Sequence, residues 1–116
     1  MSRFFKSFQY AIQGIKYNFS TQLNFKIHCL GFVFMNLTAY FLDFSLWEYI
    51  VCLILAALVF FAELMNTAIE SVVDLSTKEY DDLAKIAKDC AAGAVLVLAI
   101  CAIAVWGLIV FSKLNL

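Results

Sequence analysis

The stretch of sequence that most constrains the fold is residues 90–111, which contain no Asp, Glu, Lys or Arg over 22 positions. A helix needs roughly 20 apolar residues to cross the hydrocarbon core of a bilayer, so this stretch is long enough to span a membrane. In the whole chain of 116 residues, 65% are hydrophobic and none is proline. This composition predicts an all-α membrane protein and argues against a loop-rich soluble domain.

Two further apolar stretches come before this run. The first is short for a span and carries His28 and Asn36, whereas the second includes an uncharged run at residues 49–62. A polar connection of mixed charge, residues 76–89, separates the second stretch from the last. The predicted membrane-spanning helices, with cytoplasmic extensions, are 26–43, 47–74 and 82–112, all within a single domain of residues 1–116.

The first 20 residues predict an amphipathic helix that lies along the membrane interface. Apolar residues recur at helical spacing from Phe4 to Phe19, and the basic residues lie elsewhere on the wheel. Residues 1–26 and residues 76–89 together hold seven of the eight Lys and Arg residues, Lys113 being the eighth. The positive-inside rule therefore predicts a cytoplasmic N-terminus and a C-terminus on the other side.

Four polar residues of the second span lie on one side of the predicted helix. Glu63, Asn66, Glu70 and Asp74 fall within an arc of about 80° on a helix of 3.6 residues per turn, with Thr67 at its border. We call these four residues the polar face. Facing lipid would cost several kcal/mol, so we expect the face to line a cavity or contact partner helices. Asp74 fits a solvated helix end equally well.

The two glutamates of the polar face have different surroundings in the sequence. Glu63 stands between Phe60, Phe61 and Leu64, and apolar neighbours disfavour the charged form of a carboxylate, which suits a general base. Glu70 lies nearer to water and is expected to stay ionised. Its oxygens can bind a divalent cation.

A second cluster, Lys88 and Asp89, stands at the cytoplasmic end of the third span. A lysine there can act as a point charge on a phosphate, and the adjacent aspartate can orient it or share a metal. The alternative, which position alone favours, is a snorkelling lysine beside an interfacial aspartate. His28 has no second histidine with which to bind a metal, so we expect a structural role at the interface. The cysteines lack metal-site spacing and are expected to be packing residues.

The sequence carries no P-loop, no kinase-type glycine loop and no nucleophile elbow. It does resemble the prokaryotic diacylglycerol kinases and their undecaprenol kinase relatives, which are small integral-membrane lipid kinases of bacteria. The resemblance rests on AELMNTAIESVVDL at residues 62–75 and AKDCAAGAVL at residues 87–96. The front of the chain, with FQYAIQGIKYNF and NFKIH, is similar to the amphipathic helix and first span of that family.

This resemblance implies an ATP-dependent kinase that phosphorylates a lipid alcohol, undecaprenol or diacylglycerol, at the cytoplasmic face of the bacterial cytoplasmic (inner) membrane. It implies Mg²⁺ as cofactor, ATP as co-substrate, a homotrimer with shared active sites and no nucleic-acid partner. Glu63 matches the general base that deprotonates the lipid hydroxyl, and Asn66 would orient one or both glutamates. Glu70 matches a magnesium ligand. The implied ATP-binding residues are Arg3, Tyr10, Gln22, Glu70, Glu79, Tyr80, Asp81, Lys88 and Asp89.

The sequence departs from the family pattern at Gln22, where the family has a second metal-binding glutamate. An amide oxygen can still bind magnesium, but one negative charge is missing from the site. Two readings stay open: an active lipid kinase with weaker metal affinity, and a catalytically weakened membrane protein that binds lipid or nucleotide. A proton or ion pathway is disfavoured, because the carboxylates of the polar face cluster toward one side of the membrane.

Overall fold

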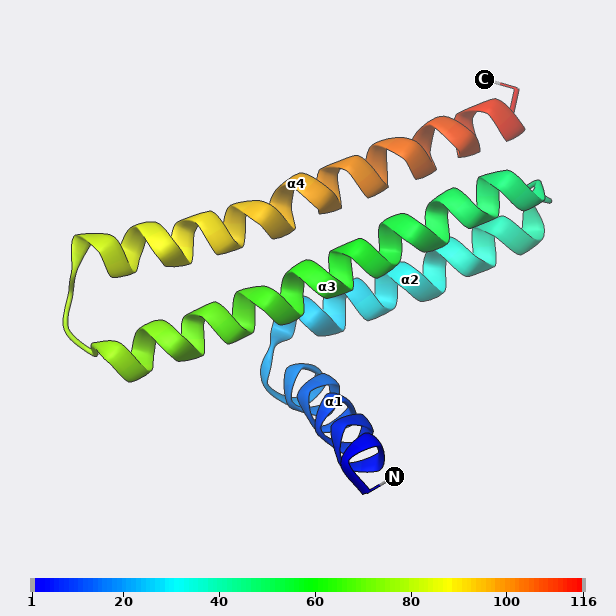
Figure 1. Ribbon diagram of the computed structural model, residues 1–116. Helices are drawn as coiled ribbons and strands as arrows, with labels where there is room; N and C mark the ends of the chain where they lie inside the picture. Colours follow the sequence, from blue (N-terminus) through cyan, green and yellow to red (C-terminus); the bar gives the residue numbers. More distant parts are fainter. Residues whose placement is uncertain (1, 116) are drawn as a thin grey trace.

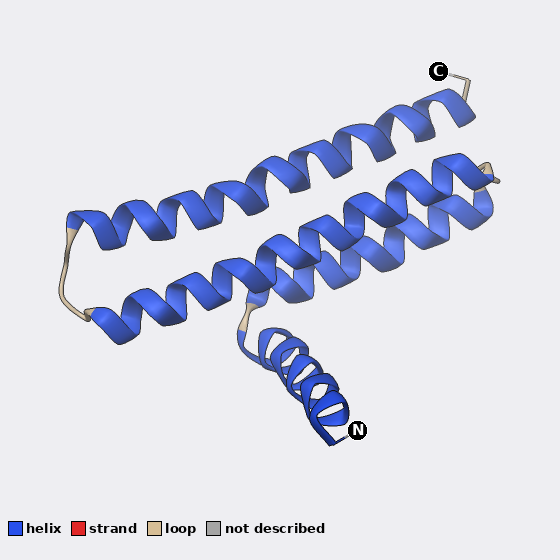
Figure 2. Cartoon of the chain, in the orientation of Figure 1, coloured by secondary structure: helices blue, strands red, loops and turns tan. Residues whose placement is uncertain are grey.

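The computed structural model describes residues 2–115, and over these residues the chain is all-helical, as the sequence predicts. The helices are α1 (Ser2–Thr21), α2 (Leu23–Phe41), α3 (Leu46–Ser76) and α4 (Asp82–Lys113). Helices α2, α3 and α4 lie side by side, and α1 projects from this bundle at a steep angle (Figure 1). Only short loops connect the helices (Figure 2). Each helix begins and ends within three residues of a range predicted for a helix.

Local side-chain hydrogen bonds define several helix ends. At the start of α3, the backbone N–H of Glu48 donates to Ser45 Oγ at 3.2 Å, and the N–H of Ser45 donates to Glu48 Oε1 at 2.8 Å. This is a capping box, which satisfies two otherwise unpaired donors. Asp81 caps α4 by accepting hydrogen bonds from two backbone amides of its first turn. Asp43 turns the chain after α2 with a φ of 55°, a conformation that Asp adopts more readily than most residues.

Among residues 2–115, two helices, α3 and α4, are long and apolar enough to cross a membrane. Helix α2 has 19 residues and does not meet the same criterion. At a rise of 1.5 Å per residue α2 is about 28 Å long, close to the roughly 30 Å of a hydrocarbon core. The three-span arrangement therefore stays a prediction.

Polar groups connect α2 to both of its neighbours inside the bundle. The Tyr49 hydroxyl donates to Asn36 Oδ1, and the indole N–H of Trp106 donates to Thr38 Oγ1 at 2.8 Å. Interhelical hydrogen bonds of this kind satisfy polar groups that lipid cannot. Asn36, which interrupts the apolar pattern of α2, is thus accommodated by a partner on α3.

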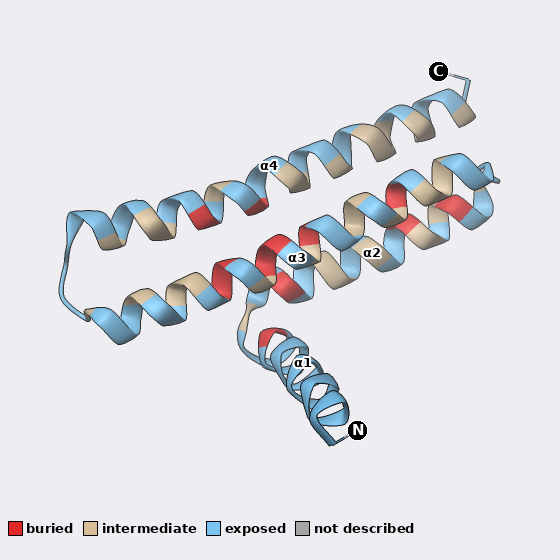
Figure 3. Ribbon diagram, viewed as in Figure 1, coloured by how far each residue is buried: buried red, intermediate tan, exposed pale blue. Residues whose placement is uncertain are grey.

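Buried residues are concentrated on α3, whereas α4 contributes few (Figure 3). The small and medium-sized side chains Cys52, Val59 and Ala62 of α3 are buried, as are Ala91 and Val95 of α4. Such small residues allow helix backbones to approach closely. The four cysteines are free. The polar residues buried with this core are Asn18, Glu63, Asn66 and Thr67.

Candidate active site

The polar face of α3 becomes more exposed from Glu63 to Asp74. Glu63 is 1% exposed and Asn66 7%, Glu70 is half-buried, and the Asp74 side chain is 56% exposed. The face is about 17 Å long at a rise of 1.5 Å per residue. One helix therefore presents a buried carboxylate at one end and an exposed carboxylate at the other.

Glu63 contacts a residue of α2 that the sequence assigns to a structural role. Glu63 Oε2 lies 3.7 Å from His28 Nε2, and this oxygen is buried without a hydrogen-bond partner. Unsatisfied buried polar atoms are rare in folded proteins and call for an explanation. An ionised carboxylate oxygen without a donor keeps its lone pairs free to accept a proton.

The Asn66 side chain contacts Glu70 on the polar face. Its Nδ2 donates to Glu70 Oε1 at 3.1 Å, while its Oδ1 is buried and has no partner. Magnesium is commonly held by one or two carboxylates together with substrate phosphates. The Glu70 carboxylate and the free amide oxygen of Asn66 fit such a partial site. Within residues 2–115, no group of three or more His, Cys, Asp or Glu gathers that could hold a metal alone.

Gln22 lies at the junction of α1 and α2, where it is the N-cap residue of α2. Its backbone N–H donates to the carbonyl of Asn18 at 2.9 Å. Its side-chain amide donates to Thr21 Oγ1 at 3.3 Å, and not to Glu70. A single chain therefore shows no hydrogen bond between Gln22 and Glu70 within residues 2–115. The joint role of the two residues in binding a metal stays a prediction.

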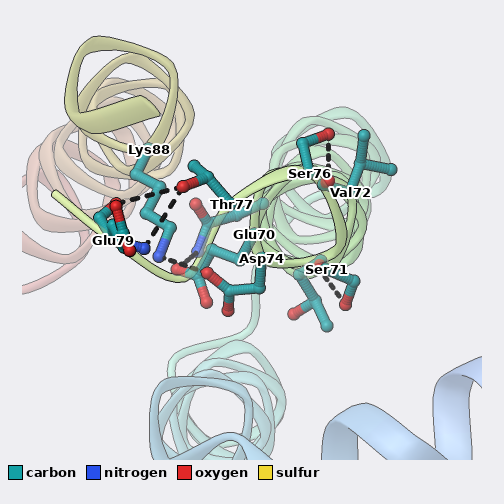
Figure 4. Close-up of polar contacts among 10 residues, drawn as sticks. Glu70, Ser71, Val72, Asp74, Ser76, Thr77, Glu79 and Lys88 are labelled. Carbon is teal, nitrogen blue, oxygen red and sulfur yellow. Dashed lines mark hydrogen bonds and ion pairs between the residues drawn. The ribbon is translucent and has the colours of Figure 1, made fainter. Parts of the chain in front are cut away.

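Helix α4 contacts the exposed end of the polar face, at Asp74. Lys88 Nζ donates to Asp74 Oδ1 at 2.7 Å, and Figure 4 shows the lysine extending toward Asp74 and Glu70. This hydrogen bond raises the pKa of Lys88 above its ordinary value, which keeps the ammonium charged. Asp89 pairs with Lys85 at 2.6 Å and not with Lys88. Adjacent residues of a helix point about 100° apart, so Lys88 and Asp89 of α4 do not face each other. The residue that holds the Lys88 ammonium is instead Asp74 of α3.

Two other predicted nucleotide-binding residues, Glu79 and Tyr80, make hydrogen bonds to residues close to them in the chain. In the connection between α3 and α4, the N–H of Glu79 donates to Thr77 Oγ1 at 3.2 Å, and the Tyr80 hydroxyl donates to Asp82 Oδ1 at 2.8 Å. Arg3 and Tyr10 are exposed on the part of α1 that projects away from the bundle (Figure 1). One chain thus brings Lys88 to the polar face but not Arg3 or Tyr10.

Asn18 is a residue of this region that the sequence analysis does not identify. It is 3% exposed, and its Oδ1 accepts a hydrogen bond of 2.8 Å from Thr67 Oγ1, which ties α1 to α3. Asn18 lies about 20° from Ala11 on a helical wheel, at the edge of the apolar face of α1. A polar residue at that position is the sequence signal for a contact with another helix.

Replacing Thr67 with valine is expected to loosen α1. Valine keeps the shape of threonine but leaves Asn18 Oδ1 buried without its donor, which costs about 1–3 kcal/mol. Amide hydrogen exchange in the last turn of α1 should become roughly 5- to 150-fold faster, because exchange reports local opening. Two control variants should show the exchange rates of the wild type. Thr67→Ser keeps the hydroxyl that donates to Asn18. Ser20→Ala removes an exposed hydroxyl that bonds only within α1. Unchanged exchange in Thr67→Val would show that this bond does not hold α1.

Known proteins are similar in sequence to most of this chain. Residues 9–110 match the model of the family described as prokaryotic diacylglycerol kinase. The chain is 47% identical over 109 residues to a diacylglycerol kinase of Synechocystis sp., covering 93% of this chain and 62% of that protein. It is 40% identical over 114 residues to an undecaprenol kinase of Bacillus subtilis, covering 98% and 93%. A diacylglycerol kinase of Escherichia coli is 28% identical over 114 residues, with the same coverage. The chain thus spans less than two thirds of the Synechocystis protein and nearly all of the other two.

Proposed function

Because this chain belongs to the prokaryotic diacylglycerol kinase family, we propose that it transfers the γ-phosphate of ATP to the hydroxyl of a membrane lipid. The reaction takes place at the cytoplasmic face of the bacterial inner membrane. The observation that carries the proposal is Glu63, a carboxylate that is 1% exposed and has an oxygen free of hydrogen bonds. A general base needs such a free oxygen within reach of the proton that it removes. Relatives named for diacylglycerol and for undecaprenol, both lipid alcohols, support the substrate class.

Each residue of the polar face has a separate part in this reaction. Glu63 accepts the proton of the lipid hydroxyl as the hydroxyl oxygen attacks the γ-phosphorus. Lys88 places a positive charge on the phosphates, and Asp74 holds its ammonium in position. Asn66 fixes Glu70, and these two residues would hold Mg²⁺ through their oxygens. When bound, the metal supplies positive charge to the phosphate oxygens, and positioning and electrostatics carry most of phosphoryl transfer.

An apolar cavity of about 440 Å³ between α2, α3 and α4 supports a lipid as the acceptor. Its wall includes His28, which contacts Glu63, and reaches Cys52 and Trp106 deeper in the bundle. From Phe60 to Cys52 the cavity follows α3 for about 12 Å. Apolar clefts with few polar groups are typical of sites for hydrocarbon ligands. A lipid chain in this cavity would leave its hydroxyl near Glu63.

We further propose that three copies of the chain, each crossing the membrane three times, assemble with shared active sites. The N-terminus lies in the cytoplasm and the C-terminus outside, in keeping with the lysine and arginine distribution. A trimer would cover the exposed outer end of the polar face, where Asp74 is 56% exposed. It would also allow Arg3 and Tyr10 of one copy to reach the nucleotide site of another, together with Glu79, Tyr80, Asp81 and Asp89. Closed symmetric assemblies are the usual form of oligomers.

The proposal is tested by phosphate transfer from labelled ATP to undecaprenol and to diacylglycerol, offered separately to the purified protein in lipid micelles. We expect label in at least one of the two lipids, with a requirement for Mg²⁺. Glucose or another water-soluble alcohol serves as the control acceptor and should take up no label. Transfer to neither lipid would overturn the proposal.

Changing Gln22 to glutamate distinguishes the active enzyme from a catalytically weakened binding protein. The added charge should lower the magnesium concentration for half-maximal rate by about tenfold, which corresponds to about 1.4 kcal/mol of attraction. Gln22→Asn keeps a neutral amide and is the matched control. If only Gln22→Glu transfers phosphate and the wild type does not, the weakened-protein alternative is correct.

A further inference from the structure

The burial of Glu63 raises the question of where its proton goes. Its side chain is 1% exposed, and Ala62 beside it is also buried. In the proposed reaction Glu63 gains a proton with each phosphate transferred, and it must lose that proton before it can act again. A carboxylate closed off from solvent needs a second group to carry the proton to water.

His28 is the group that meets this requirement. Its Nε2 lies 3.7 Å from Glu63 Oε2, the oxygen without a hydrogen-bond partner. A shift of less than 1 Å would bring the two atoms within hydrogen-bond distance. The His28 side chain is 20% exposed, so part of the imidazole is accessible where the Glu63 carboxylate is not. Imidazole is the side chain that most readily exchanges protons near neutral pH.

The other charged or polar groups near Glu63 are already engaged. On α3 itself, Glu70 accepts a hydrogen bond from Asn66. Helix α1 contributes the neutral Asn18, which bonds to Thr67, and Lys88 of α4 is paired with Asp74. Among the described residues, His28 is therefore the group in contact with Glu63 that can take its proton.

We propose that His28 is a positioning residue that acts through Glu63 and returns it to the carboxylate form after each turnover. This inference rests on the proposed function. As the lipid oxygen forms its bond to the γ-phosphorus, the bond to ADP breaks and the hydroxyl proton passes to Glu63. Glu63 then gives that proton to His28 Nε2, and the imidazolium releases one proton to water from its exposed edge. This role differs from the structural role at the interface that the sequence analysis expects for His28.

The test compares the wild type with His28→Ala and His28→Gln in lipid micelles, at saturating ATP and Mg²⁺. His28→Ala is expected to lower kcat about 10²-fold, the lower end of acid–base contributions, with the KM for ATP within about twofold of the wild type. Free imidazole should restore the rate of His28→Ala in proportion to the concentration of its neutral form. Glutamine keeps polarity and bulk but cannot carry a proton, so His28→Gln should be equally slow and should not respond to imidazole.

The outcomes separate this inference from the proposed function. If the wild type phosphorylates a lipid but His28→Gln keeps more than a third of its kcat, or imidazole does not restore His28→Ala, the relay is wrong and the kinase stands. If the wild type phosphorylates neither lipid, both fail. The helical content of each variant is checked by circular dichroism, and if His28→Ala does not fold, the rate of His28→Gln decides.

Discussion

Replacing Glu63 with glutamine is expected to lower kcat by about 10²- to 10⁴-fold, the range in which a general base contributes. Glutamine has nearly the shape of glutamate and fits the same buried position, but its amide cannot accept the proton of the lipid hydroxyl. ATP binding should not change, because Glu63 lies at the buried end of the polar face, away from Lys88. Initial rates of label transfer and a separate nucleotide titration measure the two effects.

The same substitution should not destabilise the protein. A neutral amide costs less to bury than a carboxylate whose Oε2 has no donor, so Tm should stay the same or rise. Glu48→Gln, at the opposite end of α3 where Glu48 pairs with Lys113 at 2.9 Å, is the matched control and should leave kcat unchanged. A Glu63→Gln protein that keeps more than a tenth of the wild-type kcat would rule out Glu63 as the base.

Glu70→Gln is the second change with a large expected effect. We expect kcat to fall by about 10²- to 10³-fold and the magnesium concentration for half-maximal rate to rise, because the variant loses the carboxylate that Asn66 positions. A metal contributes several kcal/mol of charge stabilisation to such a transition state, and each 1.36 kcal/mol is a factor of ten in rate. Rates measured over a series of Mg²⁺ concentrations at fixed ATP give both quantities.

Asp74→Asn is the comparison for this experiment, because Asp74 lies one turn further along the same face. It should raise the KM for ATP by freeing Lys88, while the dependence on magnesium stays that of the wild type. If Asp74→Asn and Glu70→Gln change the magnesium dependence to the same extent, Glu70 has no special part in metal binding.

The sequence predicts the features that depend on a single helix. Apolar runs and periodicity predict the all-helical class, and helical spacing places Glu63, Asn66, Glu70 and Asp74 on one face. The Asn66–Glu70 hydrogen bond joins residues four apart on that face, so the same spacing suffices to predict it.

Contacts between helices could not be predicted in this way. The pairing of Lys88 with Asp74 and the contact of His28 with Glu63 depend on how α4 and α2 rotate and slide against α3. Hydrophobic patterns fix which side of a helix faces inward but not its partner across the interface. The sequence therefore pairs Lys88 with its chain neighbour Asp89 and treats His28 as structural.

The hydrogen bond between Asn18 and Thr67 has a consequence for the choice of substrate. If α1 lies along the membrane interface, as the sequence predicts, this bond sets the position of α3 relative to the lipid head groups. Glu63 is one turn from Thr67, about 6 Å along the helix axis. The base then reaches hydroxyls held just beneath the surface, whatever chain they carry. Substrate selection in such a protein depends more on the depth of the hydroxyl in the bilayer than on the structure of the lipid. The same fold then accepts lipids as different as a diglyceride and a polyprenol.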